Sequence, residues 1–233
     1  MEEDHFERIY RQQAGAYQRL IQAEDVDRNL SAALHALADL SGKQILDAGA
    51  GTGRIAQLLD RVDRQIIGVD RIPAMLAENT RMRDRQGGSW SLVQADLRSL
   101  PFPQGEFEIT ICGWAIGHWC FWSTQEWQQQ VDRLLAELER VTRPGGWLVV
   151  LETLGTGTQQ PGPPNPKLAE YYQRLEQVWG FERQVLATDY AFESVEAAAA
   201  SLSFFFGPEL EAKIRQHQWQ RVPEWTGLWA VQL

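Results

Sequence analysis

The chain has 233 residues, of which 31 are acidic and 22 basic, so its formal net charge is −9. This length suits one large α/β domain better than two. The acidic balance argues against a broad surface for nucleic-acid phosphates. Cys112 and Cys120 have no histidine pair nearby, so their spacing favours neither a zinc site nor a disulfide framework. The composition therefore predicts neither a nucleic-acid partner nor a metal site.

Membrane and secretory signals are not evident in the sequence. The first residues, Met1–Asp4, are acidic and lack the basic-then-apolar order of a secretory signal. No apolar run approaches the length of a membrane span. We therefore expect a cytoplasmic protein with no membrane partner.

Apolar residues at helical spacing open the chain and predict helices over residues 4–40 that end at Ser41–Gly42. Strands and helices then alternate, which predicts a mostly parallel sheet covered on both faces. The strands are expected at 44–48, 65–69, 90–94, 107–113 and 146–152, and the helices near 53–61, 73–84 and 124–141.

The regular alternation stops after the fifth predicted strand. Between Thr153 and Pro166 the chain has three glycines and four prolines. We expect a cap there, with helices at 167–180 and 194–206, a further helix to about 217, and an extended stretch at 185–192. Residues 220–231 are interpreted as a hairpin that turns at Thr226–Gly227. A single domain would then comprise a helical lid (1–40), a cofactor-binding core (41–152), a cap (153–217) and a C-terminal hairpin (218–233).

A glycine-rich turn follows the first predicted strand, with glycines at 49, 51 and 53. Glycine permits a sharp turn and close approach of a ligand, and the next helix offers free N–H groups. A dinucleotide fingerprint needs its third glycine at position 54, where this chain has Arg54, so a nicotinamide-dependent oxidoreductase fits poorly. Asp70 and Asp96 follow the next two strands and are suited to ribose and adenine. Taken singly, each aspartate could instead be a cap.

Four sequence blocks occur in order across residues 45–151: Ile45–Gly53, Gly68–Asp70, Gln94–Leu97 with Leu100–Phe102, and Arg140–Leu148. Together they resemble the class I S-adenosylmethionine-dependent methyltransferases. The resemblance implies an α/β fold, a Rossmann-like three-layer sandwich whose mostly parallel seven-stranded sheet has an antiparallel last strand. An N-terminal helical lid and a helical cap inserted after strand five would complete it.

The same resemblance implies S-adenosylmethionine as the cofactor. Asp70 would hold the ribose hydroxyls, Gly49 and Gly51 would approach the methionine part, and Asp96 with the Leu97 amide would contact the adenine. The full set of implied cofactor-binding residues is Asp47, Gly49, Ala50, Gly51, Gly53, Asp70, Arg71, Asp96, Leu97 and Gly113.

His118 is the candidate catalytic residue. Methyl transfer from a sulfonium is an in-line displacement that depends mainly on positioning, so no catalytic triad is needed. A base is required only if the acceptor must lose a proton. His118 follows the fourth predicted strand by five residues, at the edge where open α/β sheets bind ligands. Alternatively, His118 forms hydrogen bonds to the backbone or to the substrate without transferring a proton.

Aromatic residues predict a substrate pocket near His118. Trp114 and Trp119 lie in the same loop, and Tyr10 and Tyr17 share one face of the first helix. Glu152 ends the fifth predicted strand at the same edge of the sheet. We expect these residues to contact a small, partly aromatic or apolar acceptor. Packing of the rings, and a solvated carboxylate at Glu152, are the alternatives.

The predicted function is methyl transfer from S-adenosylmethionine to a small-molecule acceptor. The alternatives are a noncatalytic protein that binds the same cofactor and a methyltransferase acting on a protein side chain. An aminopropyltransferase on the same fold would need acidic residues after the fourth strand. The stretch Gly113–Trp119 contains none, which disfavours this reaction.

Overall fold

The computed structural model describes residues 5–60, 63–122 and 125–233. Its strands are β1 (Gln44–Ala48), β2 (Gln65–Asp70), β3 (Ser91–Gln94), β4 (Phe107–Gly113), β5 (Thr142–Thr156), β6 (Glu182–Ala187), β7 (Tyr190–Ala191), β8 (Arg221–Val222) and β9 (Glu224–Gln232). Its helices are α1 (His5–Gln12), α2 (Ala14–Ile21), α3 (Asn29–Leu37), α4 (Arg54–Leu59), α5 (Pro73–Gln86), α6 (Trp119–Trp122), α7 (Trp127–Val141), α8 (Pro166–Gln177), α9 (Val195–Phe206) and α10 (Pro208–His217).

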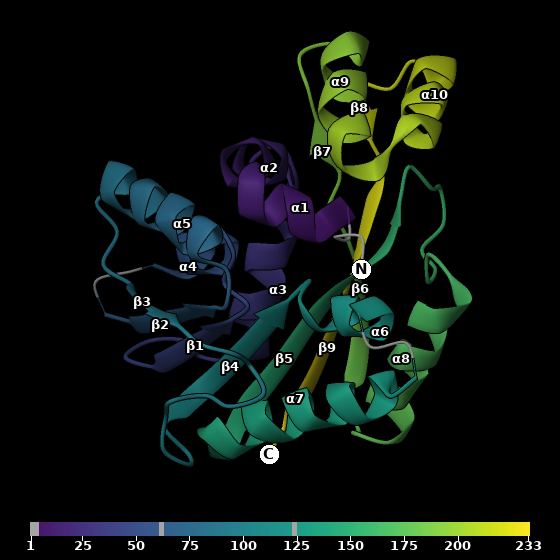
Figure 1. Ribbon diagram of the computed structural model, residues 1–233. Coiled ribbons are helices and arrows are strands. Elements are labelled where there is room, and N and C mark those ends of the chain that lie inside the picture. The colour runs from purple at the N-terminus through teal and green to yellow at the C-terminus, as the bar shows by residue number, and fades with distance from the viewer. Residues whose placement is uncertain (1–4, 61–62, 123–124) are drawn as a thin grey trace.

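Seven of these strands form the central sheet, in the order β3-β2-β1-β4-β5-β9-β6 (Figure 1). Strands β1 to β5 pair in parallel, and β9 runs antiparallel to both of its neighbours, β5 and β6. The predicted fold class is confirmed. The five predicted strands are also confirmed, although β5 extends four residues beyond the prediction at each end.

Two apolar layers cover the sheet. On one face, residues of α7 and α8 such as Leu134 and Tyr171 pack on the strands, and on the other face Leu30 of α3 and Leu59 of α4 do so. Because both faces are covered, the central strand β5 has a continuous apolar run, Trp147–Leu151, rather than an alternating one. Ile111 in β4 is fully buried.

The predicted hairpin at Thr226–Gly227 is wrong. Both residues lie inside the continuous strand β9, where Gly227 pairs with Glu152 on β5 and with Val185 on β6. The preceding strand of the sheet is β6, which lies within the segment predicted as the cap. A Cβ on Gly227 would lie 2.3 Å from the ring of Trp229, so this glycine makes room for a buried ring rather than forming a turn.

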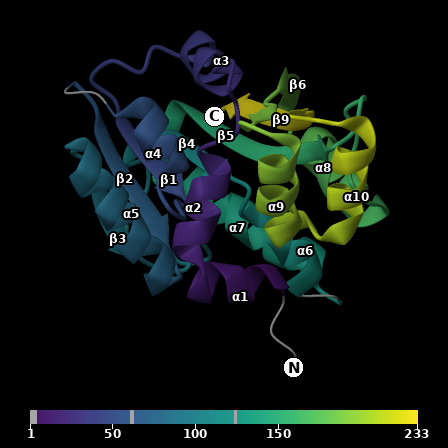
Figure 2. The same cartoon turned by 90° about the horizontal axis from the view of Figure 1, so that it is seen from above.

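Helices α1 and α2 lie over the carboxyl edge of the sheet (Figure 2). The segment predicted as helical over 4–40 divides into α1, α2 and α3. Helices α1 and α2 both contact α5, and α2 also contacts α9. Residue 4, the predicted helix end at 61 and the predicted helix start at 124 lie outside the described residues.

The predicted cap contains helices and strands. Helices α8, α9 and α10 occupy the expected positions, and the extended stretch predicted at 185–192 divides between β6 and β7. Helices α9 and α10 project beyond the sheet beside the pair β7 and β8 (Figure 1). Across the described ranges, none of the helices combines the length and apolar character needed to cross a membrane.

The position of Gly227 gives a test of the sheet. We expect Gly227→Ala to lower the free energy of unfolding by about 1 to 3 kcal/mol, because the added methyl overpacks the core against Trp229. Urea denaturation measures the change. Gly162→Ala is the matched control, since its added Cβ meets no atom within 4 Å. Equal stability of the two variants would contradict the placement of Gly227 inside β9.

Candidate active site

The turn after β1 has glycines where side chains would not fit. Gly49 has a φ of +76°, and a Cβ there would lie 2.6 Å from the Cβ of Ala115. Gly53 has a φ of +94°, and its Cβ would lie 2.6 Å from Oδ1 of Asn79. Each position combines a left-handed backbone with a close neighbour, so glycine is required. The bare backbone from Gly49 to Thr52 lines a cavity.

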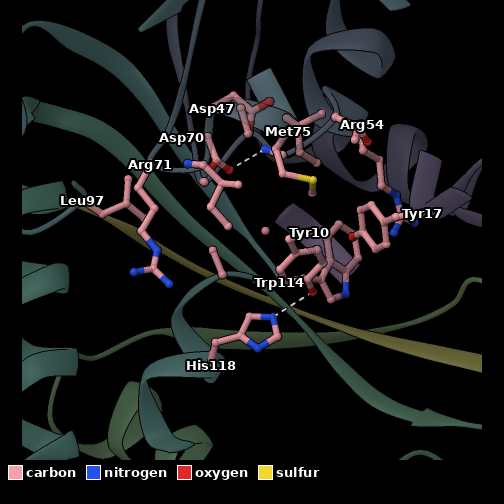
Figure 3. A pocket seen from close by; sticks show the side chains of 18 of the residues that line it. Tyr10, Tyr17, Asp47, Arg54, Asp70, Arg71, Met75, Leu97, Trp114 and His118 are labelled. Carbon is pink, nitrogen blue, oxygen red and sulfur yellow. Dashed lines mark hydrogen bonds between the residues drawn. The ribbon is translucent and has the colours of Figure 1, made fainter. Parts of the chain in front are cut away.

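Asp70, the last residue of β2, fixes this turn (Figure 3). Its Oδ2 accepts a hydrogen bond of 2.8 Å from the Gly51 amide, and its Oδ1 accepts one of 2.8 Å from the Ile72 amide. Asn79 donates to the Gly51 carbonyl at 3.1 Å. Burial raises the pKa of Asp70, and its backbone hydrogen bonds oppose this shift. The carboxyl group borders the cavity and keeps lone pairs for a ligand.

We call this cavity, of about 90 Å³, the inner pocket. It lies at the carboxyl edge of the sheet, as predicted, and is roofed by residues of α1 and α2. The predicted site residues that line it are Tyr10, Tyr17, Asp47, Gly49, Ala50, Gly51, Asp70, Arg71, Leu97, Gly113, Trp114, His118 and Trp119. The lining residues that the sequence analysis missed are Ile21, Thr52, Arg54, Ile55, Ile72, Met75, Ala115 and Trp122.

Three predicted site residues are not among the residues that line the inner pocket. Gly53 packs against α5, as described above. Asp96 forms an ion pair with Arg98, with Oδ2 and Nη2 2.6 Å apart. The hydrogen bond from Arg98 lowers the pKa of Asp96. The carboxylate of Asp96 is therefore engaged by Arg98, whereas its neighbour Leu97 lines the pocket. Glu152 borders a second cavity instead.

His118 lies in a short 3-10 turn, Ile116–His118, that follows β4. Its Nε2 is 3.0 Å from the hydroxyl oxygen of Tyr10 (Figure 3). Its ring stacks on Trp122, with centroids 5.0 Å apart and planes inclined by 12°. Helix α1, which carries Tyr10, therefore contacts the candidate catalytic residue directly.

Arg54 is a site residue that the sequence analysis missed. There it served only to show that position 54 lacks the third glycine of a dinucleotide fingerprint. Its Nη1 is 2.9 Å from Oε2 of Glu24, and its guanidinium lies 3.9 Å from the ring centroid of Trp114. Tyr190 donates a hydrogen bond of 2.9 Å to the same Glu24 oxygen. Because Glu24 precedes Arg54 by thirty residues, no local spacing in the sequence could indicate this pair.

A larger cavity of about 610 Å³ adjoins the inner pocket, and we call it the outer cavity. Its size falls within the common range for ligand sites, about 300 to 1,000 Å³. Its aromatic lining residues, drawn from the lid, the β4 loop and the cap, are Phe6, Tyr10, Tyr17, Trp114, Phe121, Tyr190, Phe205 and Phe206. Its ionisable lining residues besides the tyrosines and His118 are Glu24, Arg54, Glu152, Glu209, Lys213 and Glu224.

Two buried carboxyl groups face the outer cavity. Glu152 is 5% exposed, and its Oε1 accepts hydrogen bonds from the Gly117 amide at 2.8 Å and the Tyr171 hydroxyl at 3.4 Å. Burial raises the pKa of Glu152 to about 8. Glu224 is 2% exposed, and its Oε1 accepts a hydrogen bond of 3.0 Å from the Thr153 hydroxyl. Its Oε2 is buried without a hydrogen-bond partner among the described residues.

Known proteins share both the sequence blocks and the fold. The family described as methyltransferase domain matches residues 46–150. Demethylmenaquinone methyltransferase of Thermus thermophilus is 33% identical over 168 residues, which is 68% of this chain and 68% of that protein. Malonyl-(acyl-carrier protein) O-methyltransferase of Serratia marcescens is 33% identical over 120 residues, 51% of this chain and 41% of that protein. The solved YcgJ protein of Bacillus subtilis shares the fold, with a TM-score of 0.58 at 18% identity over 86% of this chain and 96% of that one.

The sheet with its antiparallel last strand, the glycine turn and the carboxylate ending β2 define a Rossmann-like nucleoside-binding fold. Together with the Thermus relative, they show that the chain belongs to the class I S-adenosylmethionine-dependent methyltransferases, as its sequence blocks predicted. Its cofactor is S-adenosylmethionine. The inner pocket suits this molecule, because the fixed carboxyl of Asp70 can accept from ribose hydroxyls beside the bare backbone at Gly49 and Gly51.

Asp47 gives a test of burial in the inner pocket. Its carboxyl is 1% exposed and accepts a hydrogen bond from the Ala56 amide, and burial raises its pKa to about 7. Since the folded pKa lies above the unfolded one, wild-type stability is lost as pH rises toward 7. We expect the stability of Asp47→Asn, relative to wild type, to increase by about 1 to 3 kcal/mol between about pH 5 and about pH 8.

Urea denaturation of the protein without ligand at the two pH values measures this difference. Asp84→Asn, at an exposed position on α5, is the control and should show no such change. A pH-independent difference for Asp47→Asn would show that Asp47 is not buried as described.

Proposed function

We propose that the protein transfers the methyl group of S-adenosylmethionine to a small-molecule acceptor held in the outer cavity. The observation that carries this proposal is the wall shared by the two cavities. Both are lined by Tyr10, Tyr17, Ile21, Arg54, Trp114 and His118. A donor in the inner pocket and an acceptor in the outer cavity would meet at this wall, as an in-line displacement requires.

The inner pocket would hold the donor through groups already fixed by the fold. Asp70 would accept hydrogen bonds from the ribose hydroxyls, the backbone at Gly49 and Gly51 would contact the methionine part, and Leu97 would pack on the adenine. When bound, S-adenosylmethionine supplies a methyl group on a positively charged sulfur. The protein supplies alignment, a contribution of about 7 to 11 kcal/mol in well-oriented reactions.

The N-terminal helices would act as a lid for this donor. The inner pocket measures about 90 Å³, whereas ligand sites commonly exceed about 300 Å³. Tyr10 on α1 and Tyr17 and Ile21 on α2 are part of its lining. These two helices pack on α5 and α9 and are not part of the sheet, so they can shift outward without breaking strand pairs. Their outward shift would admit the donor, and their return would exclude water from the reacting atoms.

The outer cavity favours a small acceptor over a protein side chain. Its aromatic walls come from α1, the β4 loop and α9, and they surround a volume suited to a small organic molecule. The Thermus relative is named for demethylmenaquinone and the Serratia relative for malonyl acyl-carrier protein. Because these acceptors differ, and the chain spans 41% of the Serratia protein, the names do not select an acceptor for this chain.

Transfer of radiolabel tests the proposal. The protein is incubated with S-adenosylmethionine labelled on the methyl group and with a small-molecule extract, and in parallel with a protein extract from the same cells. We expect label in compounds of low mass, with transfer inhibited by S-adenosylhomocysteine. Label confined to protein would contradict a small acceptor. Saturable donor binding with no transfer to either extract would contradict catalysis.

His118 can be tested with the acceptor found in that screen. If His118 takes a proton from the acceptor, His118→Asn should lower turnover by about 100-fold, because proton transfer of this kind contributes that much or more. Affinity for S-adenosylhomocysteine should stay within about twofold, because the substitution leaves Asp70 and the glycine turn unchanged. Unchanged turnover would show that His118 only borders the site.

A further inference from the structure

We propose that the outer cavity binds its acceptor as an elongated organic amine, whose ammonium group pairs with Glu152 and whose far end donates a hydrogen bond to Glu224. This inference rests on the proposed function and names the chemical class of the acceptor. The methyl group would be transferred to the amine nitrogen.

The outer cavity is lined by more acidic side chains than basic ones. Arg54 is already neutralised by Glu24 at 2.9 Å. Glu209 and Lys213 are both exposed on α10 and have opposite charges, so they contribute no net charge at the rim. Glu152 and Glu224 remain, and neither forms an ion pair with any described residue. Burial and the nearby charge of Glu24 raise the pKa of Glu224, and the charge of Arg54 lowers it. The cavity therefore still contains more buried acidic groups than cations.

Glu152 lies close to the wall that the two cavities share. Its Oε1 accepts from the amide of Gly117, the residue just before His118, and His118 borders both cavities. Burial raises the pKa of Glu152 to about 8, so its anion is unfavourable when no cation is present. An ammonium ion is the ligand that stabilises a buried carboxylate most directly, by a charge-assisted hydrogen bond.

Glu224 independently favours a ligand that donates a hydrogen bond. Its side chain is 2% exposed and lines the cavity, yet its Oε2 has no hydrogen-bond partner within the described part of the chain. A buried polar atom without a hydrogen-bond partner is unfavourable, so a ligand that donates to it would gain affinity.

The separation of the two carboxyl groups requires an elongated ligand. Glu224 pairs with Thr156 on β5, four residues beyond Glu152. Because a bulge lies between Thr153 and Thr156, Glu224 lies three residues along β9 from Gly227, the partner of Glu152. Three residues of strand span on the order of 10 Å, so a ligand that contacts both groups must be elongated. The rings of Phe6, Tyr17 and Phe205 pack together at centroid distances of 4.9 to 5.4 Å and provide apolar walls for the body of the ligand.

The proposed methyl transfer conserves atoms, electrons and charge. The bound ammonium releases one proton to the neutral imidazole of His118. The lone pair freed on nitrogen forms the N–C bond while the S–C bond breaks, and sulfur keeps the electron pair of that bond. The products are an N-methylammonium ion and S-adenosylhomocysteine, and His118 returns its proton to solvent.

Four probe compounds test the ammonium group and the hydrogen bond to Glu224 separately. Tyramine has an ammonium group and a distant phenol. Its isostere tyrosol replaces the ammonium with a hydroxyl, and 4-hydroxyphenylacetate replaces the aminomethyl group with a carboxylate. Phenethylamine lacks the phenol. With S-adenosylhomocysteine bound, calorimetry should show tyramine binding at least about tenfold more tightly than tyrosol or 4-hydroxyphenylacetate, and about fivefold more tightly than phenethylamine.

Two substitutions assign these preferences to residues. Glu152→Gln should remove the preference for tyramine over tyrosol. Glu224→Met, which is similar in size and has no oxygen to accept from the phenol, should remove the preference for tyramine over phenethylamine. Both variants should keep their affinity for S-adenosylhomocysteine, which shows that they fold. Glu211→Gln, which alters an exposed carboxylate paired with Arg215, is the control and should leave all four probes unaffected.

The outcomes separate this inference from the proposed function. If tyramine binds no more tightly than tyrosol at up to about 10 mM, or if Glu152→Gln keeps the preference, the inference is overturned. Label transferred in the extract screen to a neutral or acidic compound would also overturn it, while the proposed function would stand. Tyramine binding through Glu152, with no label transfer to any compound, would instead overturn the proposed function and the transfer to nitrogen, while the amine-binding site would stand.

Discussion

The hydrogen bonds from the Gly51 and Ile72 amides to the carboxyl of Asp70 are the contacts on which the rest of the site depends. They join the end of β2 to the turn after β1, and so hold bare backbone beside a carboxyl group. The glycine turn can be this tight only because Gly49 and Gly53 lack side chains that would strike Ala115 and Asn79. Without this junction, the inner pocket would have no fixed acceptor for ribose and no room beside it.

The sequence predicted this part of the protein well because its signals are local. A buried strand, a glycine turn and an aspartate after the next strand lie close together in sequence and in space. The last strand was mispredicted because Thr226–Gly227 has the composition of a turn, whereas the space next to Gly227 is filled by Trp229 and the strand pairs with Glu152 and Val185. The conformation of this segment therefore depends on a tertiary contact that the local sequence pattern does not reveal.

Long-range contacts also determine what the sequence missed in the site. Arg54 gains its partner from Glu24, and Glu224 reaches the outer cavity only because β9 is one strand rather than two. Asp96 was placed correctly after β3, but Arg98, two residues further on, engages its carboxylate. Glu152 was predicted at the substrate edge, whereas its burial and its bond to the Gly117 amide required the folded β4 loop. The sequence thus predicted more of the residues that line the inner pocket than of those that line the outer cavity.

A crystal structure with S-adenosylhomocysteine tests the central claim most directly. The account predicts the ribose hydroxyls bonded to the carboxyl of Asp70, the amino-acid part beside Gly49 and Gly51, and the sulfur directed to the wall shared with the outer cavity. Product bound elsewhere, with Asp70 contacting only the Gly51 and Ile72 amides, would contradict it.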